Sequence, residues 1–225
     1  MNHGQALIDH NRAAWDRQAS EVREWSRPVE SSTIAAARDG RWQVHLTPRA
    51  LPLDWLGDVR GRRILCLASG GGQQAPVLAA AGADVTVFDL SDGQLEQDRA
   101  VAARDGLQLR TVQGDMRDLH VFANDSFDVV FHPISNLYVP DVRPVWTECR
   151  RVLKPGGILL FTAADREKGA YAAYRAKEGE PDDGIPGDRW HESDTSPVFM
   201  HSSTETETRG ELSETGFTVI ECPLS

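Results

Sequence analysis

The chain has 225 residues, of which 40% are hydrophobic, and it carries a formal net charge of −10. This length and composition are typical of one ordinary globular domain that buries a core of its own. The acidic balance disfavours nucleic acid and anionic membranes as primary partners, because negative charge on the protein repels both.

The cysteines and the N-terminal residues bear on the compartment. Cys66, Cys149 and Cys222 are widely spaced and form no C-x-x-C pair, which indicates reduced thiols, with no disulfide framework or zinc site. Residues 1–10 lack a basic region followed by an apolar one, so no signal peptide is expected, and no apolar run has the length of a membrane span. We expect a cytoplasmic protein without a bound metal, and its oligomeric state stays open.

The first sixty residues predict an N-terminal helical cap and a linker. Residues 5–26 are expected to be helical, because apolar residues such as Leu7 and Trp15 recur among charged ones until Pro28 ends the run. Residues 28–60 carry prolines and scattered aromatic residues and are predicted to be irregular.

Residues 61–164 show a regular alternation of strand and helix patterns. Strands are expected over residues 64–67, 85–88, 109–113, 127–131 and 158–162, and helices over 73–81, 92–104 and 143–153. Ser91 is a candidate N-cap, Gly106 a candidate helix stop, and Lys154–Gly157 a turn. The alternation predicts an α/β fold, a doubly wound, mostly parallel Rossmann-like sheet with right-handed crossovers.

The pattern changes after Asp165. Residues 165–203 contain a short helix candidate at 170–177 and a polar stretch at 178–197, which together predict a lid or a mobile insertion. Residues 204–225 are expected to complete the core with a helix near 207–215 and a strand at 217–222.

The glycine-rich segment after the first predicted strand of the core is the most informative motif. Gly70, Gly71 and Gly72 follow an apolar strand and precede a helix, and Asp89 ends the next strand. Glycines allow close approach to a ligand, and the carboxylate can accept hydrogen bonds from ribose hydroxyls. The motif predicts a nucleoside-bearing cofactor, and alone it also satisfies the dinucleotide fingerprint.

Further motifs follow in a fixed order. They are Gly114-Asp115-Met116, Phe127–Phe131, Arg151–Gly157 and, at the N-terminus, Asn11–Ala19 with Trp15-Asp16. With the glycine loop, they make residues 60–165, and more weakly 204–222, resemble the class I S-adenosylmethionine-dependent methyltransferases, specifically the small-molecule branch with the ubiquinone and menaquinone biosynthesis methyltransferases.

The resemblance implies a set of contacts to S-adenosylmethionine. The implied cofactor-binding residues are Ala68, Ser69, Gly70, Gly71, Gly72, Asp89 for the ribose, Leu90, Asp115 and Met116 for the adenine, and His132. Trp15, Asn136 and Tyr138 are expected to cover or orient the substrate.

His132 is the candidate catalytic residue, because it directly follows the fourth predicted strand of the core, at the edge where ligands bind in this topology. A neutral imidazole there could accept a proton from the methyl acceptor, and Tyr138 is a second candidate. The alternative interpretation is structural, in which a hydrogen bond from His132 stabilises the loop after the strand.

Two features depart from the family pattern. The chain has Cys66 where the family usually has an acid and Ala68 where it usually has a glycine. In addition, the family sheet closes with a final antiparallel strand, and the chain stops about where that strand should start. The closing strand is therefore either absent from the sequence or supplied by a segment such as 196–201.

The predicted activity is methyl transfer from S-adenosylmethionine to a small-molecule acceptor. The protein would accelerate it mainly by aligning the acceptor with the methyl group, with His132 as a possible base. Two alternatives remain open on the sequence alone. One is a cofactor-binding protein without catalysis, and the other is a nicotinamide-dependent oxidoreductase.

Overall fold

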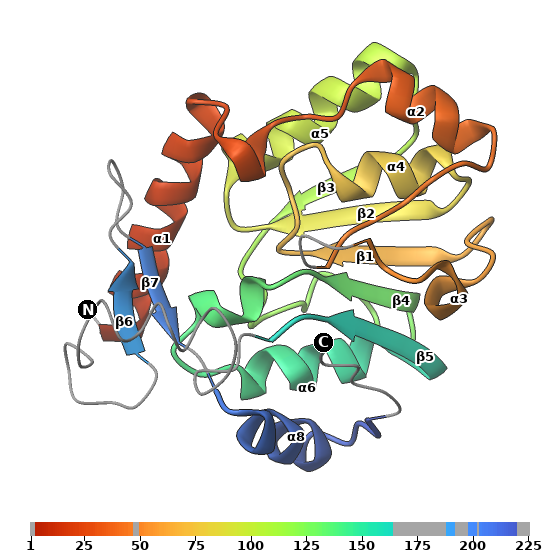
Figure 1. The fold of residues 1–225 in the computed structure, drawn as a ribbon. Helices are drawn as coiled ribbons and strands as arrows, with labels where there is room; N and C mark the ends of the chain where they lie inside the picture. The colour runs from red at the N-terminus through yellow and green to blue at the C-terminus, as the bar shows by residue number, and fades with distance from the viewer. Residues whose placement is uncertain (1–2, 47–49, 164–187, 192–197, 202, 220–225) are drawn as a thin grey trace.

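A computed structural model describes residues 3–46, 50–163, 188–191, 198–201 and 203–219. A parallel sheet of five described strands forms its centre, in the order β3-β2-β1-β4-β5 (Figure 1). The strands are β1 (Arg63–Leu67), β2 (Asp84–Asp89), β3 (Arg110–Gln113), β4 (Phe127–His132) and β5 (Leu153–Phe161). The order reverses beside β1, so the carboxyl ends of β1, β2 and β4 meet where ligands bind in such sheets.

Helices cover both faces of the sheet (Figure 1). They are α4 (Gln74–Ala80), α5 (Asp92–Asp105) and α2 (Ser31–Arg38) on one face, and α6 (Arg143–Val152) and α8 (Glu205–Glu214) on the other. Strand β1 alternates between them: Ile64 and Cys66 join the core under α4 and α5, whereas Leu65 and Leu67 join the core under α6. Burial of both faces explains why the strands are continuous apolar runs.

The N-terminal helix α1 (His3–Ser20) packs beside α5 through a polar contact. Asp16 Oδ1 accepts hydrogen bonds from Ser91 Oγ at 2.5 Å and from Gly93 N at 3.1 Å, at the start of α5. A two-stranded antiparallel ribbon, β6 (Asp188–His191) and β7 (Val198–His201), lies beside α1 (Figure 1). Within the described residues, no helix combines the length and apolarity needed to cross a membrane.

The elements predicted for the core are confirmed, with ends that differ by at most one residue except at the start of β5, which begins five residues earlier than predicted. Ser91 caps α5 by accepting from Gln94 N, and Gly106 ends that helix with φ +65° in the left-handed region. The prediction of an irregular 28–60 segment was wrong in part. It contains α2, in which an alanine run favours the helix, and the short α3 (Leu53–Leu56).

Two further predictions need correction. Residues 154–157 do not form a turn before β5 but an irregularity within it: the register passes from Phe127↔Leu153 to Val129↔Ile158, with Gly156 at φ +76°. Residues 198–201 do not close the main sheet, because they pair only with β6. Residues 217–219 are not in a strand, whereas 170–177 and 220–222 lie outside the described residues.

Candidate functional site

A cavity of about 330 Å³ opens at the carboxyl edge of the sheet. The end of β2, the segments that follow β1, β3 and β4, the helix α1 and residues 45–46 all contribute to its lining. Among the expected site residues, it brings together Trp15, Ala68, Ser69, Gly70, Asp89, Leu90, Asp115, Met116 and Tyr138. A single cavity therefore joins most of the residues that the sequence places at separate strand ends.

The glycine loop after β1 is held by acidic side chains. Gly70 N donates to Asp89 Oδ2 at 3.0 Å, and Gly71 N donates to Asp98 Oδ2 at 3.1 Å. A Cβ atom on Gly71 would lie 2.7 Å from Trp25 O, and one on Gly70 would lie 2.8 Å from Gln94 Cβ. These glycines are thus required by close packing, and their amides bind protein carboxyl groups.

Gly71 and Gly72 do not line the cavity. Gly72 lies against the N-terminal segment instead, where its carbonyl accepts from Val29 N at 2.9 Å. The expectation that all three glycines contact the cofactor therefore finds geometric support only at Gly70. Gly71 and Gly72 lie on the side of the loop away from the cavity, where they pack against α5 and residues 25–28.

Asp89 ends β2 and faces the cavity. Its two carboxylate oxygens accept from Gly70 N and, at 2.9 Å, from Ser91 N. Burial raises the pKa of Asp89 to about 6, and the two amide hydrogen bonds oppose that rise. The group is therefore ionised at neutral pH and can accept further hydrogen bonds, since a carboxylate has about four acceptor positions.

Asp115 and Met116 line the cavity from the segment that follows β3. The Asp115 carboxylate is fixed by Arg117, with Nη2 to Oδ2 at 2.5 Å and Nε to Oδ1 at 3.0 Å. Gly114 before it packs so closely that a Cβ atom would lie 2.2 Å from Phe88 Cζ. The acid is thus held in one orientation at the cavity wall.

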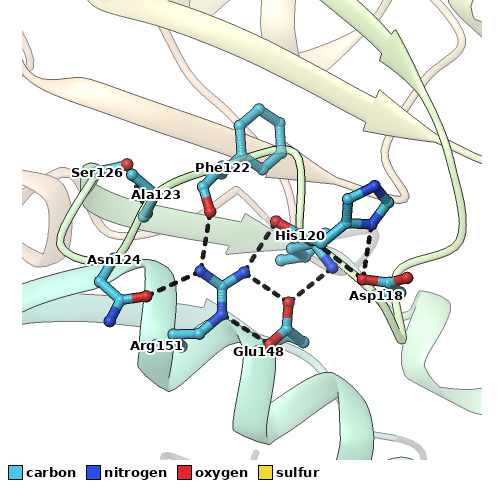
Figure 2. Close-up of polar contacts among 9 residues, drawn as sticks. Asp118, His120, Phe122, Ala123, Asn124, Ser126, Glu148 and Arg151 are labelled. Atoms are coloured by element: carbon cyan, nitrogen blue, oxygen red, sulfur yellow. Dashed lines mark hydrogen bonds and ion pairs between the residues drawn. The ribbon is translucent and has the colours of Figure 1, made fainter.

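The segment that follows Met116 is clamped to α6 by one arginine (Figure 2). The Arg151 guanidinium donates to Phe122 O at 2.8 Å, Leu119 O at 2.9 Å and Asn124 Oδ1 at 3.0 Å. Its partner Glu148 accepts from Leu119 N at 2.7 Å. Arg151, the first residue of the Arg151–Gly157 motif, therefore secures the loop that begins with Asp115.

His132 and Asn136 do not line the cavity, in contrast to the expectation. The His132 ring is fully buried, with Nδ1 2.9 Å from Leu67 O and an edge-to-face contact with Trp146. Burial lowers the pKa of His132 to about 4. The Asn136 amide, in the orientation that satisfies its neighbours, donates to Thr162 O and Ile134 O. This geometry supports the structural interpretation of both residues.

Aromatic side chains also contribute to the wall of the cavity. Trp15 and Tyr138 line the cavity in a T-shaped pair, with 5.2 Å between ring centroids. Asn11 Nδ2 donates to Tyr138 O at 3.2 Å and so links α1 to this wall. Ile134 completes it at φ +52°, a strained conformation for a β-branched residue, with 41% of its surface exposed.

Sequence reasoning missed several residues of this site. Among them, His45 and Gln94 line the cavity, and Asp98 lies behind the glycine loop. The sequence carried a signal for Asp98, because it shares a helical face with Leu95 and Val101. It carried none for His45, whose amide is held by Gln74 Oε1 at 2.8 Å, from a helix 29 residues away.

Cys66 is fully buried under α5. Burial, followed by the charge of Asp98, raises the pKa of its thiol, so no reactive thiolate forms there. No group of three His, Cys, Asp or Glu residues in the described part of the chain could hold a metal ion.

Comparison with known proteins finds sequence similarity to methyltransferases. Residues 65–161 match the methyltransferase domain family. The chain is 53% identical over 156 residues to YbaJ, an uncharacterized methyltransferase of Bacillus subtilis, covering 69% of this chain and 61% of that protein. It is 35% identical over 156 residues to a demethylmenaquinone methyltransferase of Clavibacter sepedonicus, covering 69% and 56%. The chain thus spans less than two thirds of these relatives.

The fold agrees with a solved structure. The 1,6-didemethyltoxoflavin-N1-methyltransferase of Burkholderia thailandensis, solved with bound 1,6-didemethyltoxoflavin and S-adenosylhomocysteine, has a TM-score of 0.65 at 16% identity, covering 98% of this chain and 82% of that one. Residues 65–161 therefore match a methyltransferase domain in sequence, and the chain shares the fold of this solved methyltransferase.

Proposed function

We propose that the protein transfers a methyl group from S-adenosylmethionine to a small apolar or aromatic acceptor. The observation that carries this proposal is the convergence of Asp89, Asp115 and Gly70 on one cavity that the aromatic pair Trp15 and Tyr138 also lines. The bound cofactor would supply an activated methyl group, so the protein's part is to align an acceptor and exclude water.

The chain's own residues divide this work. Asp89 would accept from the ribose hydroxyls with its free acceptor positions, and Asp115 with Met116 would hold the adenine. Ser69, Gly70 and Leu90 would form the wall along the rest of the donor. Trp15, Tyr138 and Ile134 would pack against the acceptor.

A proton acceptor is needed only where the acceptor must lose a proton. Among the described residues, His45 is the imidazole that lines the cavity, whereas His132 does not. We therefore assign this role to His45. His132 keeps a structural role at the end of β4.

Binding of S-adenosylhomocysteine to the full chain by calorimetry tests the donor site, with NADH as the control ligand. We expect heat of binding with S-adenosylhomocysteine and none with NADH, and the reverse would favour an oxidoreductase. Transfer of a labelled methyl group to a panel of phenols, quinols and aromatic amines then tests the activity. Binding without transfer to any of them would favour a cofactor-binding protein without catalysis.

A further inference from the structure

Asp98 is an acid inside the core of the protein. It lies on the face of α5 that also carries Leu95 and Val101, and its surface is fully buried. A buried carboxyl group opposes folding unless its hydrogen bonds compensate. Packing alone therefore does not account for an acid at this position.

The carboxyl group of Asp98 holds the back of the glycine loop. Its Oδ2 accepts from Gly71 N at 3.1 Å, and the Gly72 amide also bonds to the carboxyl group. Gly71 N is shared with Gln94 O at 3.0 Å, one turn earlier on α5. Helix α5 thus fixes two consecutive amides of the loop.

The other side of the loop is confined by residues of the segment 25–28. A Cβ atom on Gly71 would lie 2.7 Å from Trp25 O, and one on Gly72 would lie 3.1 Å from Pro28 Cβ. The loop is therefore enclosed between α5 and residues 25–28. Ser69 and Gly70, directly before the enclosed glycines, are the part that reaches the cavity.

We propose that Asp98 is a positioning residue of the cofactor site, which fixes Gly71 and Gly72 so that Ser69 and Gly70 keep the geometry that binds the donor. This inference rests on the proposed function and deepens it. Asp89 acts on the cavity side of the loop and Asp98 acts from behind it.

The groups around Asp98 favour its neutral form. Burial raises the pKa of Asp98 to about 8 and the charge of Asp89, at the end of β2, adds to the rise, whereas the Gly72 and Gly71 amides and Arg99 oppose it. Cys66, which faces it from β1, is a neutral thiol. A neutral acid offers the loop an acceptor oxygen, which asparagine offers as well, so Asp98→Asn is the conservative substitution.

The test compares variants that keep or remove the acceptor. Calorimetry with S-adenosylhomocysteine at pH 7 is expected to give Asp98→Asn an affinity within about threefold of wild type, because the loop amides keep their partner. Asp98→Leu fills the same space without an acceptor, and Asp98→Ala removes both. Each is expected to bind about tenfold more weakly, as the loss of a buried hydrogen bond predicts.

A matched control separates positioning from general stability. Val101→Ala on the same buried face should lower the thermal midpoint and leave affinity unchanged, because Val101 makes no polar contact with the loop. Wild-type affinity in a folded Asp98→Leu or Asp98→Ala would overturn the inference, as would a loss of affinity in Val101→Ala equal to that in Asp98→Ala. Failure of the proposed function would differ, since the wild type itself would then not bind S-adenosylhomocysteine.

Discussion

Two strand ends at the same edge of the sheet carry a titratable residue, and only one of them reaches the cavity. Asp89 at the end of β2 lines the cavity, whereas His132 at the end of β4 is fully buried. Burial favours the neutral form of both, raising the pKa of Asp89 to about 6 and lowering that of His132 to about 4. At neutral pH one is nevertheless a charged acceptor and the other an uncharged ring.

The difference comes from the chain that follows each strand. After Asp89, Ser91 starts α5 at once and the chain leads away from the cavity. After β4, Pro133 and Ile134 turn into a short 3-10 helix, η2 (Ser135–Tyr138), whose residues Ser135 and Tyr138 line the cavity in place of His132. A strand end therefore places a residue at the carboxyl edge of the sheet. Whether that residue lines the cavity or is buried depends on the path of the residues that follow the strand.

The contrast between Asp89 and His132 can be tested by mutation, and Asp89→Ala is expected to have the largest effect on binding. The variant should bind S-adenosylhomocysteine about a hundredfold more weakly, because charge-assisted hydrogen bonds contribute about 1.5–3 kcal/mol each. Calorimetry measures the affinity. In the wild type, affinity should also fall as the pH drops below about 6, since protonation of Asp89 removes acceptor capacity.

Asp84 provides the control for this variant, because it begins the same strand and is exposed at the opposite edge of the sheet. Asp84→Ala should bind like the wild type. If Asp89→Ala retained its affinity as well, the assignment of Asp89 to the ribose would be wrong.

The loop after β3 extends the comparison to a third strand end. Arg151 on α6 holds this loop, and we expect its contacts to keep Asp115 at the cavity. Arg151→Met removes the bonds to Phe122 O and Leu119 O and should lower the free energy of unfolding by about 2 kcal/mol. Urea denaturation measures this loss. Affinity for S-adenosylhomocysteine should weaken by a few-fold, because Asp115 begins the released loop.

The exposed Arg143 at the start of the same helix is the matched control, and Arg143→Met should cost less than about 0.5 kcal/mol. Equal losses in the two arginine variants would show that the contacts of Arg151 are no stronger than a surface ion pair.

The alternation of strands and helices could be predicted because its signals are local. Apolar runs, the Ser91 cap and the Gly106 stop each act within a few residues of chain. The position of Asp89 at the cavity could be predicted in the same way, because the carboxyl ends of parallel strands lie at one edge of the sheet. The alanine-rich α2 also had a local signal, which the surrounding prolines and aromatic residues obscured.

The rest of the site depends on contacts between distant residues. Asp98 bonds to a loop amide 27 residues away, and His45 is placed by Gln74 from 29 residues away. Ile134, two residues after the buried His132, adopts a left-handed conformation, which the sequence does not suggest for a β-branched residue. Such contacts form only in the folded chain. The position of His132 at a strand end was therefore not enough to predict that His45 lines the cavity and His132 does not.

The smallest expected effect tests whether His132 belongs to the core. Its folded-state pKa of about 4 lies below the ordinary 6.5, so the unfolded chain binds a proton more readily between these values. The stability that the buried neutral ring contributes is therefore present above about pH 6.5 and is lost as the pH falls toward 4. Between pH 7 and 5.5 this loss amounts to about 1 kcal/mol.

His132→Gln removes this titration, and its amide can still donate to Leu67 O as the ring does. Urea denaturation at both pH values should show that the variant lacks the extra loss of about 1 kcal/mol seen in the wild type. Identical pH dependence in the two proteins would mean that the ring titrates as it does in water. His132 would then have access to solvent at the cavity edge, and the contrast with Asp89 would disappear.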